Sequence, residues 1–241
     1  MAIFPESSPM VLPKNAFQNR QRDLIRHQGK RHPYDRILIV TEGTKTEPFY
    51  LEEIRRLHRP SSPHIHVRPC ESGTSPHQIV EDAEKLFHKG DPSNKKIKAR
   101  SFDKIYVVFD RDEHEHYDEA LHRARDLDGH IKNDEKKWIP FKAIPSIPCF
   151  ELWLLLHFQE VHAPLHRNEA KMLLRGHIPD YEKGMKTTFA DTRKHLDVAL
   201  SRAKRLAERT TPDNPEQWPY TAMHELVEEL LKNARDAGQT V

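Results

Sequence analysis

Carboxylates follow two apolar stretches of this chain, and residues of this kind can hold a divalent cation. Glu42 comes directly after the stretch ILIVT, and Glu47 follows shortly afterwards. Asp110 and Asp112 come after a second apolar stretch, IYVVF. Because clustered carboxylates repel one another, a group of them needs protons or a bound cation. Their hard oxygen ligands suit Mg²⁺ or Mn²⁺, which keep open positions for water.

A divalent ion at these acids would orient a phosphodiester and activate water for attack. On this hypothesis Asp110 and Asp112 hold the ion, and Glu42 either ligates a metal or acts as general base toward the water. The residues leave open whether one or two metals bind. A single aspartate after a strand is usually a turn residue or a helix cap, so the prediction depends on the joint pattern. Gly43 lets the backbone approach the site closely.

The acids can meet only if the two apolar stretches are neighbouring parallel strands. Unbroken apolar runs suit strands that are buried on both faces, as in a parallel sheet. The pattern predicts strands over residues 36–41, 64–70, 104–109 and 138–144, separated by helices. This alternation predicts an α/β fold with a mostly parallel, Rossmann-like sheet flanked by helices. Ligands bind at the carboxyl ends of the strands in such sheets, where Glu42 and Asp110 are expected.

The remainder of the chain has a different pattern. A buried helix is predicted over 149–158, and helical periodicity continues over 167–176, 188–208 and 221–235 with no further strand signal. The predicted organisation is a core over 34–160 and a helical C-terminal elaboration over 161–241. Residues 1–33 mix proline, serine and basic residues with weak periodicity, which is typical of a flexible basic arm.

Composition constrains the function less than the acids do. The 241 residues are 32% charged, yet the formal net charge is only +2, so the whole-chain charge does not demand a nucleic-acid partner. Cys70 and Cys149 form no CxxC pattern, which argues against a disulfide framework and a cysteine-rich zinc site. With no apolar run long enough to span a bilayer, we expect a cytoplasmic protein without a membrane partner.

Several stretches resemble a known family when they are taken together and in order. ILIVTEGTKTE and YVVFDRDEH resemble the Toprim domain, in which a strand-end glutamate and a later Asp-x-Asp bind divalent metal. The resemblance is closer to the RloB family, grouped with the nuclease-type Toprim domains of overcoming-lysogenization-defect proteins. It is carried by VTEGTKTEPFY, ESGTSP, VVFDRDEH, IPCFELWLLLHF and TAMHELVEELL, which span most of the chain.

The resemblance implies a Toprim-like core that cleaves nucleic acid with Mg²⁺ or Mn²⁺, in bacterial defence against phage by abortive infection. It makes Glu42, Asp110 and Asp112 the catalytic and metal-binding acids, with Glu47 and Glu151 as further metal ligands. Glu151 opens an otherwise apolar helix, where a carboxylate is costly unless it is paired or metal-bound. A partner for the helix dipole is the other explanation of Glu151.

The expected partner is a nucleic acid, and the residues do not distinguish DNA from RNA, including tRNA. Basic residues can neutralise phosphates. The candidates are Lys45, Lys95, Lys96, Arg111, Arg202 and Lys204. The chain has no P-loop, so ATP-driven sensing would require a separate ATPase, a partner that the family context suggests. The oligomeric state is open, with a homodimer as one alternative.

Two other functions compete with a nuclease. YVVFDRDEH also fits a haloacid-dehalogenase-like phosphatase, in which the first aspartate would be the nucleophile. That motif normally opens its fold, whereas two predicted strands precede it here, and Asp112 is followed by Glu-His-Glu where such phosphatases have Gly-Thr. The third hypothesis is a non-catalytic module whose acids hold a structural ion or a partner protein.

Overall fold

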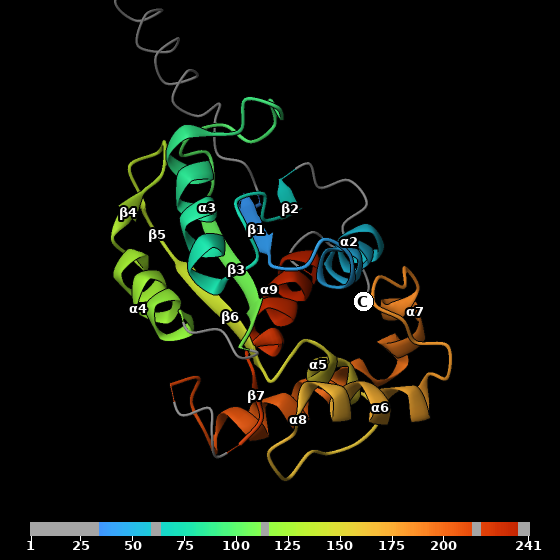
Figure 1. Ribbon diagram of the computed structural model, residues 1–241. Coiled ribbons are helices and arrows are strands. Elements are labelled where there is room, and N and C mark those ends of the chain that lie inside the picture. Colours follow the sequence, from blue (N-terminus) through green and yellow to red (C-terminus); the bar gives the residue numbers. More distant parts are fainter. Residues whose placement is uncertain (1–33, 59–63, 112–115, 214–217, 236–241) are drawn as a thin grey trace, which may run out of the picture. The chain divides into compact units, whose positions relative to one another are not determined.

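The computed structural model describes residues 34–58, 64–111, 116–213 and 218–235. The predicted arm over 1–33 and Asp112 lie outside these residues. Within them, a sheet of five strands has the order β2-β1-β3-β6-β7 (Figure 1). The strands are β1 (Ile37–Thr41), β2 (Ile65–Pro69), β3 (Lys104–Asp110), β6 (Phe141–Ile147) and β7 (Tyr220–Thr221). The first four are parallel, and β7 is antiparallel to β6.

Helices flank this sheet, so the predicted α/β fold is confirmed. The helices are α2 (Thr46–His58), α3 (Pro76–Lys89), α4 (Tyr117–Leu127), α5 (Glu151–Leu155), α6 (Arg167–His177), α7 (Thr188–Thr192), α8 (Leu196–Ala207) and α9 (Met223–Arg235). α3 and α4 pack together against β1, β3 and β6, whereas α2 packs against α9, which contacts β6. β1 and nearly all of β3 are buried, because helices cover both faces of a parallel sheet.

Helix ends follow local chemistry. α3 begins after Ser75, with Pro76 in its first turn, and the side chains of Ser75 and Gln78 form a capping box, which satisfies N–H groups that lack helical partners. The predicted helix over 188–208 is broken in the structure. A turn of 3-10 helix, η1 (Arg193–His195), separates α7 from α8. The predicted helix over 149–158 is regular only within α5.

The prediction that no strand follows residue 167 is wrong. β7 pairs with β6 over only two residues, through Ser146 with Thr221 and Ile147 with Tyr220. The buried hydroxyl groups of Ser146 and Thr221 lie 2.9 Å apart and form a hydrogen bond. Two residues are too few to show the alternation by which a strand is recognised in a sequence.

None of the described helices is long and apolar enough to cross a membrane.

Replacing Thr221 with valine should destabilise the fold by about 1–3 kcal/mol, because the buried hydroxyl of Ser146 then lacks its partner. The backbone N–H of Met223, which donates to Thr221 Oγ1 over 3.3 Å, also loses its acceptor. The cost can be measured as the change in the free energy of urea unfolding. In a double-mutant cycle, Ser146→Ala should add little to Thr221→Val; fully additive costs would contradict the pairing.

Candidate functional site

An open pocket of about 290 Å³ lies at the carboxyl edge of β1 and β3. Three of the predicted acids line it, each from a different element, and cationic side chains share its wall. The acids are Glu42, Glu47 and Asp110, and the cations are Lys45, Arg167 and Lys183. The structure therefore brings Glu42, which follows β1, together with Asp110 of β3, as their positions after the apolar stretches predicted. Glu47 of α2, which only the family resemblance indicated, lines the same pocket.

Glu42 joins the ends of the two central strands. Its backbone N–H donates to the carbonyl of Val108 over 2.9 Å, which continues the parallel ladder past β1. Its carboxylate accepts a hydrogen bond of 2.8 Å from the backbone N–H of Asp110. Asp110 is the last residue of β3 and is 5% exposed. The sequence placed it just past the strand, so the structure corrects this position by one residue.

Glu47 is buried in the first turn of α2. Burial raises the pKa of Glu47 to about 7, and the nearby charges of Glu42 and Glu151 raise it further, against its own backbone hydrogen bond and Lys183. Its carboxyl group lies so close to Gly43 that a Cβ there would overlap it. Gly43 therefore makes room for the Glu47 side chain, which gives the close approach expected at this glycine a concrete partner.

Glu151 begins α5 and is 1% exposed. Its Oε1 atom accepts a hydrogen bond of 3.4 Å from the hydroxyl of Tyr181, whereas its Oε2 atom has no partner within the described chain. Glu151 influences the pKa of Glu47, Cys149, Tyr181 and Lys183, so it lies close to the other acids. A buried carboxylate oxygen without a partner is costly, and a cation would satisfy it.

Lys183 supplies positive charge that the sequence did not reveal. Loss of water around its ammonium group lowers the pKa of Lys183, but Glu151, Asp110 and Glu47 act in the opposite direction and raise it overall. The neighbouring backbone N–H of Gly184 donates to Thr46 Oγ1 over 2.9 Å. This bond fixes the loop that carries Lys183 against the start of α2.

The described acids fit a divalent cation, although they do not complete its coordination. No group of three His, Cys, Asp or Glu side chains within the described residues is arranged to hold a metal ion. Glu42 and Asp110 offer oxygen ligands in an open pocket. Glu151, which is buried and does not line that pocket, carries an orphaned oxygen. Oxygen donors of this kind suit Mg²⁺ or Mn²⁺, which retain several water ligands. Asp112, predicted as a ligand, lies outside the described residues.

The predicted nucleic-acid contacts lie at three places. Lys45 lines the acidic pocket, and Arg111 directly follows Asp110. The exposed side chains of Lys95 and Lys96 lie in the loop before β3, at the opposite edge of the sheet. The remaining two candidates are on α8, where the ammonium group of Lys204 forms an ion pair with Glu228.

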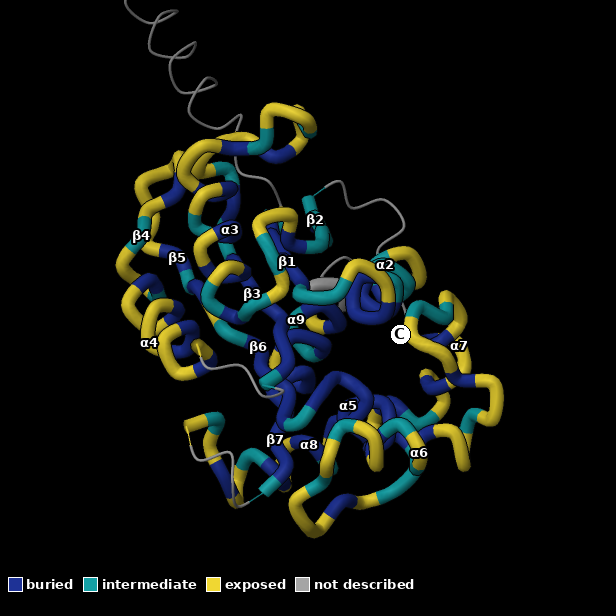
Figure 2. Tube along the Cα trace, viewed as in Figure 1, coloured by how far each residue is buried: buried dark blue, intermediate teal, exposed yellow. Residues whose placement is uncertain are grey.

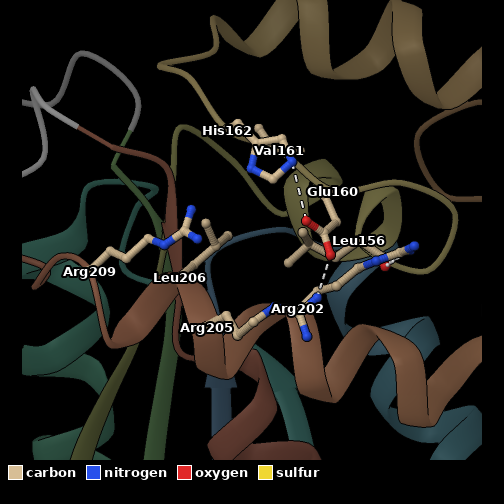
Figure 3. Close-up of a pocket in the computed structure, with 8 residues that line it drawn as sticks. All are labelled: Leu156, Glu160, Val161, His162, Arg202, Arg205, Leu206 and Arg209. Atoms are coloured by element: carbon tan, nitrogen blue, oxygen red, sulfur yellow. Dashed lines mark hydrogen bonds and ion pairs between the residues drawn. The ribbon is translucent and has the colours of Figure 1, made fainter.

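A second, smaller hollow lies beside α8 and shares no described lining residue with the acidic pocket (Figure 3). Arg202 lines it and donates a hydrogen bond of 2.8 Å to the carbonyl of Leu156. Glu160 forms an ion pair with Arg205, and its carboxylate lies 3.2 Å from Nε2 of His162. These internal partners occupy much of the basic charge that the sequence shows on this helix.

The fold and the site together define a class: a Rossmann-like α/β protein with an acidic pocket at the carboxyl edge of its sheet. The family model of the RloB-like protein matches residues 37–230, and this chain belongs to the RloB-like family. The match includes Glu42, Glu47, Asp110, Glu151 and Lys183. No curated protein and no solved structure matches the chain.

The raised pKa of Glu47 predicts a loss of stability as the pH rises. Between about pH 4.5 and 7 the folded protein retains a proton that the unfolded chain releases, so folding is favoured below this window and weakened through it. The loss is on the order of 3 kcal/mol. In a chelator, Glu47→Gln should therefore reduce the fall in melting temperature between pH 5 and 8, measured by thermal unfolding.

Glu182→Gln is the matched control, because Glu182 is exposed. It should leave the pH profile of the wild type unchanged. If Glu47→Gln and Glu182→Gln gave identical profiles, Glu47 would not be the group that retains the proton.

Proposed function

We propose that this protein is a metal-dependent nuclease of the Toprim type, which hydrolyses phosphodiester bonds in DNA or RNA. The observation that carries the proposal is the convergence of Glu42, Glu47 and Asp110 in one open pocket with cations on its wall. Membership of the RloB-like family supports it, as does the resemblance of the two acidic stretches to Toprim signatures.

In the proposed reaction the acids and the cations act on different groups. Asp110 would ligate Mg²⁺ or Mn²⁺, with Glu151 as a further oxygen donor, and Glu42 is kept for the proton transfer. A divalent ion supplies charge stabilisation at the phosphoryl oxygens and lowers the pKa of bound water. Lys183, Lys45 and Arg167 are placed to bind the anionic oxygens of a phosphate that enters the pocket. Such contacts stabilise charge that develops during attack.

The proton transfer is assigned to Glu42. The oxygen of a water molecule forms a bond to phosphorus as the bond from phosphorus to the leaving oxygen breaks. Glu42 takes the proton of that water, and the leaving oxygen receives a proton from solvent. Glu42 suits this role because it is only partly buried and one of its oxygens is held by the backbone of Asp110. A general base in a fixed position contributes about a hundredfold or more to the rate.

Glu47 and Glu151 would tune the site through charge. Glu47, with a pKa of about 7, holds a proton in the metal-free pocket at lower pH and loses it when a cation enters. Metal affinity therefore rises with pH around neutrality. This coupling explains how several buried carboxylates can share one small space in the absence of metal.

The biological setting follows from the family resemblance. We place the nuclease in defence against phage, acting in the cytoplasm with a separate ATPase as a partner. The alternative of a phosphatase with Asp110 as nucleophile receives no support from the topology, because β1 and β2 precede β3 in the chain. Cleavage of nucleic acid and hydrolysis of p-nitrophenyl phosphate, measured side by side, distinguish the nuclease from the phosphatase.

Loss of either strand-end acid should abolish cleavage while the fold survives. Asp110→Asn and Glu42→Gln should each reduce cleavage of supercoiled DNA or of RNA in Mg²⁺ by at least about a hundredfold. Asp110→Asn should keep or raise the melting temperature in chelator, because it removes one of several like charges. Asp118→Asn and Glu182→Gln, at exposed positions, are the matched controls and should cut as the wild type does.

Full cleavage by Asp110→Asn would remove that residue from the catalytic site. Hydrolysis of p-nitrophenyl phosphate, without cleavage of nucleic acid, would instead indicate the phosphatase.

Millimolar Mg²⁺ should raise the melting temperature of the wild type by a few degrees, because the ion binds the folded state selectively. The shift should be larger at pH 8 than at pH 6, where protons compete at Glu47. In Glu47→Gln this difference should shrink, and in Asp110→Asn the shift itself should shrink. Thermal unfolding with and without Mg²⁺ measures both effects, and an unshifted wild type would count against a metal site.

A further inference from the structure

A basic surface lies at the amino edge of the sheet, opposite the acidic pocket. It is formed by the loop over 91–103, which leads into β3, and by the hairpin of β4 (Ile131–Lys132) and β5 (Trp138–Ile139), which leads into β6. We call it the amino-edge surface. The tube in Figure 2 shows much of both segments exposed. Since β3 has seven residues, about 23 Å separates this edge from the pocket.

Hydrogen bonds join the loop and the hairpin into one surface. The backbone N–H of Asp134 donates to the carbonyl of Arg100 over 2.8 Å, and Asn133 donates to Asp103 over 2.7 Å. Arg36, at the start of β1, binds both Asp103 and Asp134. Two of the acids in these segments are therefore neutralised by one partly buried guanidinium group. These contacts hold the loop and the hairpin together without a ligand, which lowers the entropic cost of binding.

The positive charges of the amino-edge surface are mostly uncompensated. Within the described chain no carboxylate forms an ion pair with any of five exposed cations, whereas Lys137 is paired with Glu135 over 2.7 Å. The five are Lys95, Lys96, Lys98, Arg100 and Lys136. Clustered cations without counter-charges repel one another, and an anionic ligand relieves that repulsion.

Arg100 and Lys136 have left-handed backbone conformations, with φ of 56° and 63°. They are the non-glycine residues of the described chain with positive φ, and they lie in the two turns that meet at this surface. A long side chain costs more than glycine in this conformation. Both turns thus carry a cationic residue at a position where glycine would cause less backbone strain.

Trp138 begins β5, two residues after Lys136, and is exposed to 60%. The ammonium group of Lys132 lies 4.1 Å from the centre of its ring, a cation–π contact. An exposed indole among lysines is the combination that binds a single strand, since bases stack on the ring and cations hold the phosphates. Acidic peptides would use the charges but have no flat group to match the ring.

We propose that the amino-edge surface binds single-stranded nucleic acid, with an unpaired base stacked on Trp138 and phosphates bound by Lys98, Arg100 and Lys136. The interaction is independent of the acidic pocket and does not require the proposed nuclease activity. It also gives a role to Lys95 and Lys96, which lie too far from the acids to hold the phosphate that is cleaved.

The test is a fluorescence titration of the full chain with short oligo(dT) and oligo(rU) in chelator at low salt. Trp153 is fully buried and Trp218 is partly buried, so stacking should quench mainly Trp138. Trp138→Phe should abolish the quenching and weaken binding severalfold. Lys98→Glu with Lys136→Glu should weaken binding about tenfold or more and reduce the salt dependence, because fewer counterions are released.

The matched control is Arg193→Glu with Lys194→Glu, which reverses two exposed charges on η1 and should bind as the wild type does. Equal loss in this control would overturn the proposal, as would an absence of quenching in the wild type. Polyglutamate that displaces oligo(dT) at equal charge concentration would also overturn it in favour of an acidic peptide. Because the assay needs no metal and no cleavage, its failure is distinguishable from failure of the nuclease proposal.

Discussion

Repulsion among carboxylates at the carboxyl edge of the sheet is the constraint on which the site depends. Asp110, Glu47 and Glu151 are all at least nine-tenths buried, where like charges are little screened by water. The protein relieves this crowding locally. Glu47 keeps a proton near neutral pH. The ammonium group of Lys183 lies close enough to the acids for their charges to raise its pKa. The repulsion that remains among these carboxylates would be lowered further by a bound cation.

The relief of this repulsion links distant parts of the chain. Glu42 follows β1 and the other acids lie on α2, β3 and α5, whereas Arg167 and Lys183 come from segments that follow α5. The helical C-terminal part thus supplies two of the three cations, Arg167 and Lys183, that line the acidic pocket, and Lys45 supplies the third. The hydrogen bond between Gly184 and Thr46 links the loop that carries Lys183 to the start of α2. Residues from both parts of the chain therefore form the pocket.

The sequence predicted best what depends on local pattern. Glu42 and Asp110 could be placed because apolar strands precede both, and parallel strands end at the same edge. The position of Lys183 in the site could not be predicted, because no recognisable sequence pattern relates a cation in a distant loop to the acids. β7 was missed because a strand of two residues is too short to show an alternation of apolar and polar side chains. Arg202 looked available for phosphate, but only the folded chain shows that its guanidinium group is bonded to the carbonyl of Leu156.

The two edges of the sheet have a consequence for the length of chain that the protein can engage. With about 23 Å between the amino-edge surface and the acidic pocket, a short oligonucleotide would reach only one of the two proposed sites at a time. A longer strand held at the amino edge would present its remaining nucleotides to the pocket at a high effective concentration. The length of β3, seven residues, would then set the shortest nucleic acid that reaches both sites. Long or folded nucleic acids would be favoured over fragments, whatever their base sequence.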